Sequence, residues 1–288
     1  CIFPSLPQVA KCFHSKVIST SEKSKVPGAV HKEFHPESAY DTAVEIVELA
    51  IDTYKERNPQ KVDIPCEPME MVAGFSVEAI KEELGGSFKP LIDAITSGKI
   101  KGIVGSVGCS NPKIQHDYGH VNLAKELMKK DILMVETGCA AVASGKEGLL
   151  VPEAAEMAGD GLREVCESLN IPPILHMGSC VDCSRILALA GELANALDVG
   201  IDQLPAAGAA PEWYAQKALT IASYFVASGF YTVVGLPPNT QGSQKVTELL
   251  TDELEDVVKA KFAFEPDPKI AARMIEKHIL SQREELGI

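Results

Sequence analysis

Short apolar runs alternate with longer amphipathic stretches through most of this chain. Three of the runs end in glycine and cysteine, and their cysteines are Cys109, Cys139 and Cys180. Short β-branched runs closed by glycine predict buried strands, and the amphipathic stretches that follow them predict helices. Because strands that alternate with helices form parallel sheets with right-handed crossovers, the pattern predicts an α/β fold, a Rossmann-like parallel sheet flanked by helices.

The same periodicity places the other elements and one boundary. Helices are expected over residues 5–16, 37–57, 76–84, 90–97, 118–130, 140–169, 184–197, 211–228, 243–260 and 268–285, and further strands over 17–20 and 231–235. The stretch 58–61, Asn-Pro-Gln-Lys, breaks the helical pattern. We therefore expect residues 1–58 to end one unit and residues 59–288 to form a second.

The three cysteines fall at turns from a strand to a helix. In a doubly wound parallel sheet these turns share one edge, where such sheets bind ligands. Several thiolates at rigid backbone positions are what an iron-sulfur cluster needs. For one cysteine, burial as a small apolar side chain is an equally good explanation, and a nucleophilic cysteine with a histidine partner remains an alternative. Three cysteines in the same context favour a shared metal centre.

Composition narrows the classes of function. The formal net charge is −13, which argues against binding to nucleic acid or to an anionic membrane. No apolar run approaches the roughly 20 residues that span a bilayer. The chain opens on Cys1 without an initiator methionine or a secretory leader, so we expect a piece of a longer polypeptide. Eight cysteines in a long, core-rich chain favour a reducing, cytoplasmic compartment over a disulfide framework.

Four motifs in order resemble the carboxyl-terminal half of anaerobic nickel-iron-sulfur carbon monoxide dehydrogenases. They are residues 108–113 (GCSNPK), 137–141 (TGCAA), 176–182 (HMGSCVD) and 211–218 (PEWYAQKA), and the opening residues 1–7 (CIFPSLP) match as well. The resemblance covers essentially the whole chain. It implies that residues 1–58 end a middle Rossmann-like domain and that residues 59–288 are the carboxyl-terminal one.

The resemblance also implies a reaction and a set of metal ligands. Carbon monoxide and water would give carbon dioxide, two protons and two electrons, reversibly, at a nickel-iron-sulfur cluster. Cys1, Cys109 and Cys139 match thiolate ligands to iron, and Cys180 matches the ligand to nickel, for which soft thiolates are suited. The family's remaining histidine and cysteine ligands, and further iron-sulfur clusters, would lie upstream. The isolated segment is therefore expected to be inactive.

Lys217 is notable even without the resemblance. It is the only charged residue from 213 to 228, and a lysine buried there either loses its proton or pairs with an anion. The alternative is that its stem reaches the surface. In the family the matching lysine donates to an oxygen of carbon dioxide held at nickel, and a fixed cation suits developing negative charge. Ile221, one turn further on, matches a residue near the cluster, although ordinary packing explains it better.

Other candidates carry weaker predictions. His176 leads the third motif, where its ring could orient a ligand, and a core histidine is an equal alternative. Cys183 forms a C-x-x-C with Cys180, departs from the family pattern, and is a hypothetical redox switch. His116 and His120 are four residues apart, but solvated or capping roles are commoner than a metal pair. The remaining cysteines, Cys12, Cys66 and Cys166, are assigned to packing.

Two other functions stay open at this stage. A hybrid-cluster hydroxylamine reductase would share the fold and bind an iron-sulfur-oxo cluster without nickel, and a metal-free Rossmann-type binding module would use its cysteines as core. If the resemblance holds, the partners implied are a second copy of the subunit in a homodimer and a ferredoxin-like electron carrier. The direction of the reaction, an association with acetyl-CoA synthase and the role of Cys183 are not determined by the sequence.

Overall fold

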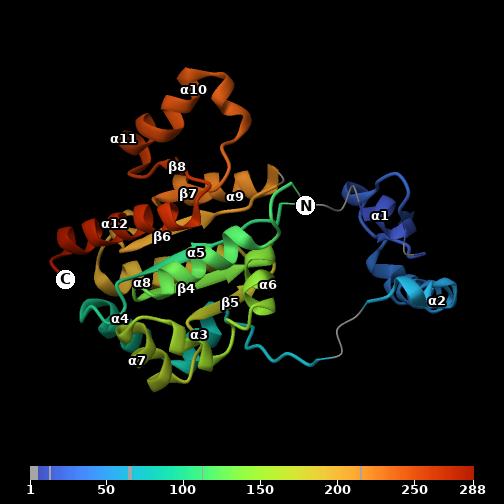
Figure 1. Ribbon diagram of the computed structural model, residues 1–288, viewed down its shortest axis with the longest axis horizontal. Coiled ribbons are helices and arrows are strands. Elements are labelled where there is room, and N and C mark those ends of the chain that lie inside the picture. Colours follow the sequence, from blue (N-terminus) through green and yellow to red (C-terminus); the bar gives the residue numbers. More distant parts are fainter. Residues whose placement is uncertain (1–5, 13, 64–66, 112, 215) are drawn as a thin grey trace. The chain divides into compact units, whose positions relative to one another are not determined.

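The computed structural model describes residues 6–12, 14–63, 67–111, 113–214 and 216–288. It divides into two compact units, of which the second begins at Met69 (Figure 1). Cys1 and Cys66 lie outside the described residues. No helix in the described part of the chain combines the length and the apolar character needed to cross a membrane.

The first unit is small. It contains α1 (Leu6–Cys12), the parallel pair β1 (Ile18–Ser19) and β2 (Val30–His31), and the long helix α2 (Ala39–Glu56), with short 3-10 turns at Glu22–Ser24, Pro36–Ser38 and Pro59–Lys61. The predicted break at 58–61 is therefore the turn that follows α2. No residue of α2 is buried within the described chain.

The second unit is built on a six-stranded parallel sheet. Its strands are β3 (Gly102–Ser106), β4 (Ile132–Thr137), β5 (Ile174–Gly178), β6 (Ala206–Ala210), β7 (Thr232–Val234) and β8 (Phe262–Phe264). They lie in the order β5-β4-β3-β6-β7-β8, and every neighbouring pair is parallel. Numbered along the chain, this is the 3-2-1-4-5-6 order of dinucleotide-binding sheets. The predicted Rossmann-like fold is confirmed.

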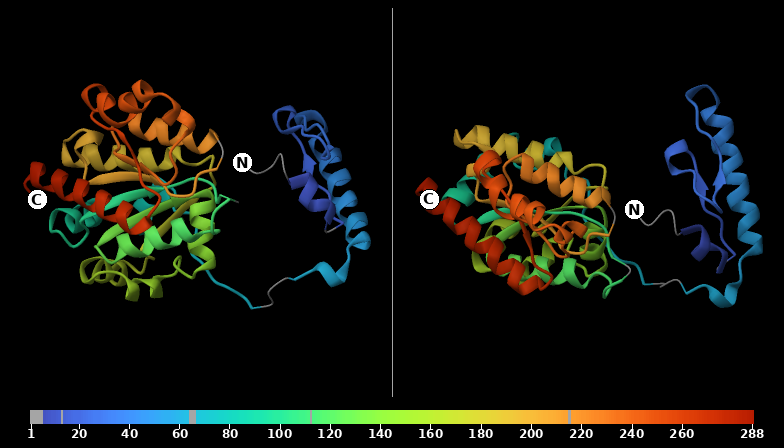
Figure 2. Two further views of the ribbon diagram at one scale, coloured as in Figure 1. Left: turned by 45° about the horizontal axis from the view of Figure 1, so that its top comes forward. Right: turned by 90° about the horizontal axis from the view of Figure 1, so that it is seen from above.

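Helices cover both faces of this sheet (Figure 2). They are α3 (Val77–Glu83), α4 (Lys89–Thr96), α5 (Tyr118–Met128), α6 (Gly138–Lys146), α7 (Asp160–Leu169), α8 (Ser184–Leu197), α9 (Gln216–Ala227), α10 (Gln244–Glu248), α11 (Leu254–Val258) and α12 (Pro268–Leu286). A Cβ atom on Gly105 would meet Ile186 of α8 and Phe225 of α9. One on Gly102 would meet Ile279 of α12, which packs beside α5. Helices α8 and α9 thus share one face, and α5 and α12 share the other.

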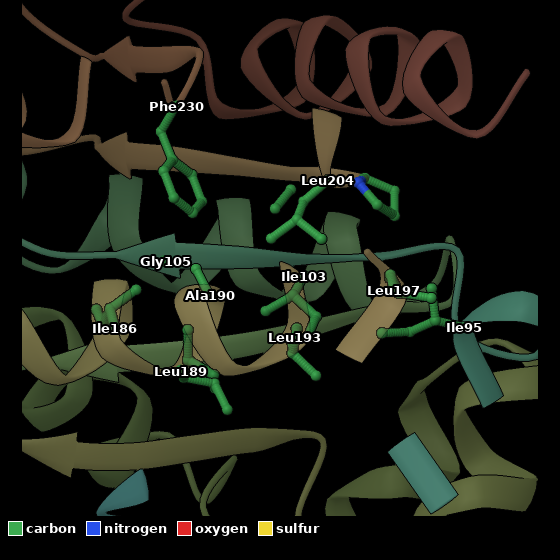
Figure 3. A pocket seen from close by; sticks show the side chains of 13 residues that line it. Ile95, Ile103, Gly105, Ile186, Leu189, Ala190, Leu193, Leu197, Leu204 and Phe230 are labelled. Carbon is green, nitrogen blue, oxygen red and sulfur yellow. The ribbon is translucent and has the colours of Figure 1, made fainter. Parts of the chain in front are cut away.

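The face beneath α8 contains a small apolar cavity of about 20 Å³. In the view of Figure 3, Ile186 and Leu193 of α8 lie below the strand that carries Ile103 and Gly105, and Phe230 lies above it; all of them line the same cavity. Its lining is almost entirely aliphatic or aromatic, so it is a packing gap in the core. No cysteine is among the residues that line it.

The structure corrects several predicted elements. β6 and β8 were not predicted, because β6 has the sequence Ala-Ala-Gly-Ala-Ala and β8 is only three residues long. The expected helix over 140–169 is divided by a 3-10 segment at Pro152–Met157 into α6 and α7. The expected helix over 243–260 is divided by a π-helical turn at Leu249–Glu253 into α10 and α11, and the helix expected from 211 begins at Gln216.

Candidate functional site

The three motif cysteines lie at the carboxyl edge of the sheet, each after its own strand. Cys109 follows β3, Cys139 is the second residue of α6 directly after β4, and Cys180 lies between β5 and α8. The three strands are neighbours in the order β5-β4-β3. Parallel strands end at the same edge, so the topology brings these turns together as predicted.

Close backbone packing joins two of these turns. Gly138 has a φ of +63°, and a Cβ atom added to it would lie only 3.0 Å from Cβ of Cys180. An L-residue with a side chain disfavours this left-handed conformation and would also crowd Cys180. Glycine at this position therefore lets Cys139 begin α6 directly beside the Cys180 turn.

Lys217 lies at the start of α9 and reaches the same place from the other half of the sheet. Its Nζ atom donates to Sγ of Cys180 over 3.2 Å. The side chain is exposed in this chain, so the expectation of burial is wrong. The reason is its position in the first turn of a helix that begins at the open edge of the sheet. Ile221, one turn further along α9, is partly buried and packs against the core.

The three thiols differ in how accessible they are. Cys109 is buried at 4% exposure, Cys139 is exposed, and Cys180 is half-buried. Within the described residues, no group of three or more His, Cys, Asp or Glu side chains is close enough to hold a single metal ion. The edge therefore presents separate thiol donors, with the Lys217 cation beside one of them.

His176 and Cys183 take positions beside the site. Nδ1 of His176 accepts from the backbone N–H of Gly178 over 3.1 Å, so its ring stabilises the turn that leads to Cys180. Sγ of Cys183 lies 3.1 Å from Oγ1 of Thr137 and donates to the carbonyl of Cys180 over 3.4 Å. Burial raises the pKa of the Cys183 thiol, which disfavours the reactive thiolate. The remaining assignments to packing hold for Cys166, which is buried, and are wrong for Cys12, which is exposed.

Two groups of the site carried no clear sequence signal. His120 of α5 is fully buried, and its Nε2 atom lies 3.2 Å from the carbonyl of Cys109, to which it donates. The solvated role expected for it is wrong, whereas His116 is exposed. Burial lowers the pKa of His120, so the ring is neutral near pH 7. The second group is the carboxylate of Glu212, which is also fully buried.

Comparison with known proteins identifies the family of this chain. The model of the Prismane/CO dehydrogenase family matches residues 1–269. The chain belongs to this family. It is 57% identical over 288 residues to carbon monoxide dehydrogenase 1 of Methanosarcina mazei, covering 100% of this chain and 46% of that protein. It is 41% identical over 302 residues to carbon monoxide dehydrogenase 1 of Carboxydothermus hydrogenoformans.

A solved structure from the Prismane/CO dehydrogenase family has the same fold. The Ni-free carbon monoxide dehydrogenase of Thermococcus sp. AM4 superposes with a TM-score of 0.95 at 56% identity, covering 100% of this chain and 45% of that one. The chain thus spans about half the length of the relatives it matches. The resemblance drawn from the four motifs is confirmed at the level of the family.

The donor set in this Prismane/CO dehydrogenase chain fits an iron-sulfur cluster better than a single ion. Thiolates that bind different metals of one cluster need not crowd around one point, and cysteine is the usual ligand of such clusters. Cys109, Cys139 and Cys180 supply three donors from adjacent turns, and Cys139 and Cys180 are accessible. Cys1, the fourth expected ligand, lies outside the described residues.

Proposed function

We propose that this chain is the cluster-ligating part of a nickel-iron-sulfur carbon monoxide dehydrogenase, which interconverts carbon monoxide and water with carbon dioxide, two protons and two electrons. The contact that supports this most is the one between Lys217 Nζ and Cys180 Sγ, at 3.2 Å. It places a cation next to the thiol that the family motif assigns to nickel. A metal-free binding module would have no need for this pairing.

The residues of the chain have distinct tasks in this proposal. Cys1, Cys109 and Cys139 would hold iron and Cys180 would hold nickel, and the bound cluster would supply two-electron redox chemistry with an open position for carbon monoxide. Lys217 would donate a hydrogen bond from Nζ to the oxygen on which negative charge develops. A cation fixed before the reaction stabilises that charge without reorganisation.

The proposed enzyme is larger than this chain. Because the chain spans about half of its relatives, the missing ligands and further iron-sulfur clusters would come from upstream, and the isolated segment would be inactive. We place the full protein in the cytoplasm of an anaerobe, as a homodimer that passes electrons to a ferredoxin-like carrier. One relative, 36% identical, is named carbon monoxide dehydrogenase/acetyl-CoA synthase subunit beta, so an acetyl-CoA synthase partner is a further possibility to test.

A hybrid-cluster reductase is the second candidate, because the matched family joins prismane proteins with CO dehydrogenases. The two differ in metal content. Full-length protein prepared without oxygen should contain nickel together with iron and acid-labile sulfide. Iron and sulfide without nickel, combined with hydroxylamine reduction, would support the second candidate.

The decisive experiment removes the cation. In the full-length enzyme, Lys217→Ala should lower kcat for carbon monoxide oxidation by about 100-fold to 1,000-fold, as expected for the loss of one charge-stabilising donor. Nickel and iron contents should stay unchanged. Lys245→Ala, at an exposed lysine of α10, is the matched control and should leave kcat unchanged. Unaltered oxidation by Lys217→Ala would overturn the assignment.

A further inference from the structure

A buried carboxylate joins the two halves of the sheet beside this site. Glu212 lies in the connection between β6 and α9 and is fully buried. Its Oε1 atom accepts from the backbone N–H groups of Gly119 over 2.6 Å and His120 over 3.4 Å. Its Oε2 atom accepts from the N–H of Asp117 over 3.2 Å. These three amides form the start of α5, which follows the Cys109 turn.

The position of this carboxylate has a simple physical basis. The first N–H groups of a helix have no partner within the helix, and the helix dipole favours negative charge there. Most helices obtain such a group from their own preceding residues, whereas the cap of α5 comes from Glu212, 93 residues away from Gly119 along the chain. The interaction therefore links two segments that only the fold brings together.

One end of the link contacts a residue of the proposed centre, and the other end precedes Lys217 along the chain. On the α5 side, His120 donates to the carbonyl of Cys109. On the other side, Glu212 is followed by Trp213, whose carbonyl accepts from Nδ2 of Asn111 over 3.2 Å. Lys217 comes five residues after Glu212, in the first turn of α9. The connection that precedes α9 is thus held against the start of α5, beside the neighbouring strands β3 and β6.

We propose that Glu212 is a positioning residue, which sets the location of Lys217 relative to Cys180 by holding the connection that leads into α9 against the start of α5. This inference rests on the proposed function. Lysine has a long, flexible stem, and the described contact at its Nζ atom is the one to Cys180. Because no second described contact fixes this flexible side chain, the location of Nζ follows the backbone at the start of α9, from which the stem extends. A misplacement of about 1 Å at a reacting centre can cost a factor of about 100 in rate.

A double-mutant cycle in the metal-loaded, full-length enzyme tests this role. Glu212→Ala should lower kcat for carbon monoxide oxidation by about 10-fold to 100-fold, with little change in KM and in nickel and iron contents. In the Lys217→Ala background the same substitution should change kcat less than two-fold, because the cation that Glu212 positions is gone. Equal effects of Glu212→Ala in both backgrounds would overturn the proposal, and so would an effect confined to metal loading.

Two further variants keep the test valid if Glu212→Ala does not fold and supply its control. Glu212→Gln keeps the shape and one acceptor oxygen, so it should lose less activity than Glu212→Ala and serves in its place if that variant does not fold. Glu192→Ala, at an exposed glutamate of α8, is the matched control and should leave kcat unchanged.

Hydrogen exchange separates the two proposals from each other. Glu212→Ala should speed amide exchange at Gly119 and His120 and also at the first hydrogen-bonded amides of α9. The wild-type enzyme could fail to oxidise carbon monoxide while Glu212→Ala still speeds exchange in both α5 and α9. That result would support the link through Glu212 and refute the proposed function. Faster exchange in α5 alone would overturn the link.

Discussion

Burial of the Glu136 carboxyl group predicts that the stability of the fold depends on pH. Glu136 lies on β4, three residues before Cys139, and is fully buried. Among the described residues neither of its carboxyl oxygens has a hydrogen-bond partner. It is paired in register with Ser106 on one neighbouring strand and with His176 on the other. Burial raises its pKa to about 8. We therefore expect Glu136 to carry a proton at pH 7.

The size and sign of the effect follow from proton linkage. The pKa rises from an ordinary value of 4.5 to about 8, and at about 1.4 kcal/mol per unit this amounts to about 5 kcal/mol. Between those two values the folded chain holds a proton that the unfolded chain has released, so raising the pH destabilises the fold. The stability is fully present below pH 4.5 and is lost as the pH rises towards 8.

Glu136→Gln removes this proton and its pH dependence. For a domain of 150–250 residues, 1 kcal/mol shifts Tm by about 2–4 °C, so the Tm of the wild type relative to Glu136→Gln should fall by roughly 3–5 °C per pH unit from pH 6 to 8. The assay is thermal unfolding of metal-free, full-length protein. Glu192→Gln, at an exposed glutamate, should leave the wild-type slope unchanged. Parallel pH profiles for wild type and Glu136→Gln would show that the carboxyl is already ionised in the fold.

Two further predictions concern the cysteine turns. Gly138→Ala should lower nickel and iron contents in full-length protein by at least two-fold, because its φ of +63° and the 3.0 Å approach to Cys180 leave no room for a methyl group; wild-type metal contents would contradict this. In metal-free protein, iodoacetamide at pH 8 should alkylate exposed Cys139 at least ten-fold faster than Cys183, which is buried and has a raised pKa, as measured by peptide mass spectrometry. Equal rates would instead support the redox-switch hypothesis for Cys183.

The elements that could be predicted from the sequence are those with a strong apolar pattern. β3 and β4 are short runs rich in branched aliphatic residues, and both were found. β6 could not be found in this way, because alanine and glycine carry little strand signal. Its small side chains make sense only in the fold, where a Cβ atom on Gly208 would lie 2.7 Å from the Phe225 ring of α9. Close packing between layers is a tertiary requirement that a local pattern does not reveal.

The candidate site also contains some residues that the sequence reveals and others that only the fold reveals. The cysteines were found because each follows a recognisable strand, and Lys217 because it is the only charge in an apolar stretch. Glu212 was missed and His120 was given the wrong role, because their partners are distant in sequence or are backbone atoms. An acidic residue before a tryptophan carries no sign that it caps a helix that begins more than 90 residues earlier. Hydrogen bonds of this kind become visible only when the topology is known.

The strand order alone does not explain why Lys217 contacts Cys180. Lys217 follows β6, Cys180 follows β5, and two other strands lie between β5 and β6. The contact arises because α8 and α9 share one face of the sheet, as Ile186 and Phe225 show by meeting over Gly105. The connections that enter these helices carry Cys180 and Lys217 to the same side.

The helices that follow Cys109 and Cys139 lie on the opposite face of the sheet. Cys139 begins α6, which packs beside α5, and α5 follows Cys109. The proposed centre therefore lies across the edge of the sheet. The proposed iron ligands Cys109 and Cys139 enter from one face, and the proposed nickel ligand Cys180 enters with Lys217 from the other. The two groups keep their geometry only if the faces are tied together at that edge. The hydrogen bonds from the start of α5 to Glu212 make such a tie, so loss of Glu212 should impair the site more than loss of an exposed charge that has no contact with it, such as Glu192 of α8.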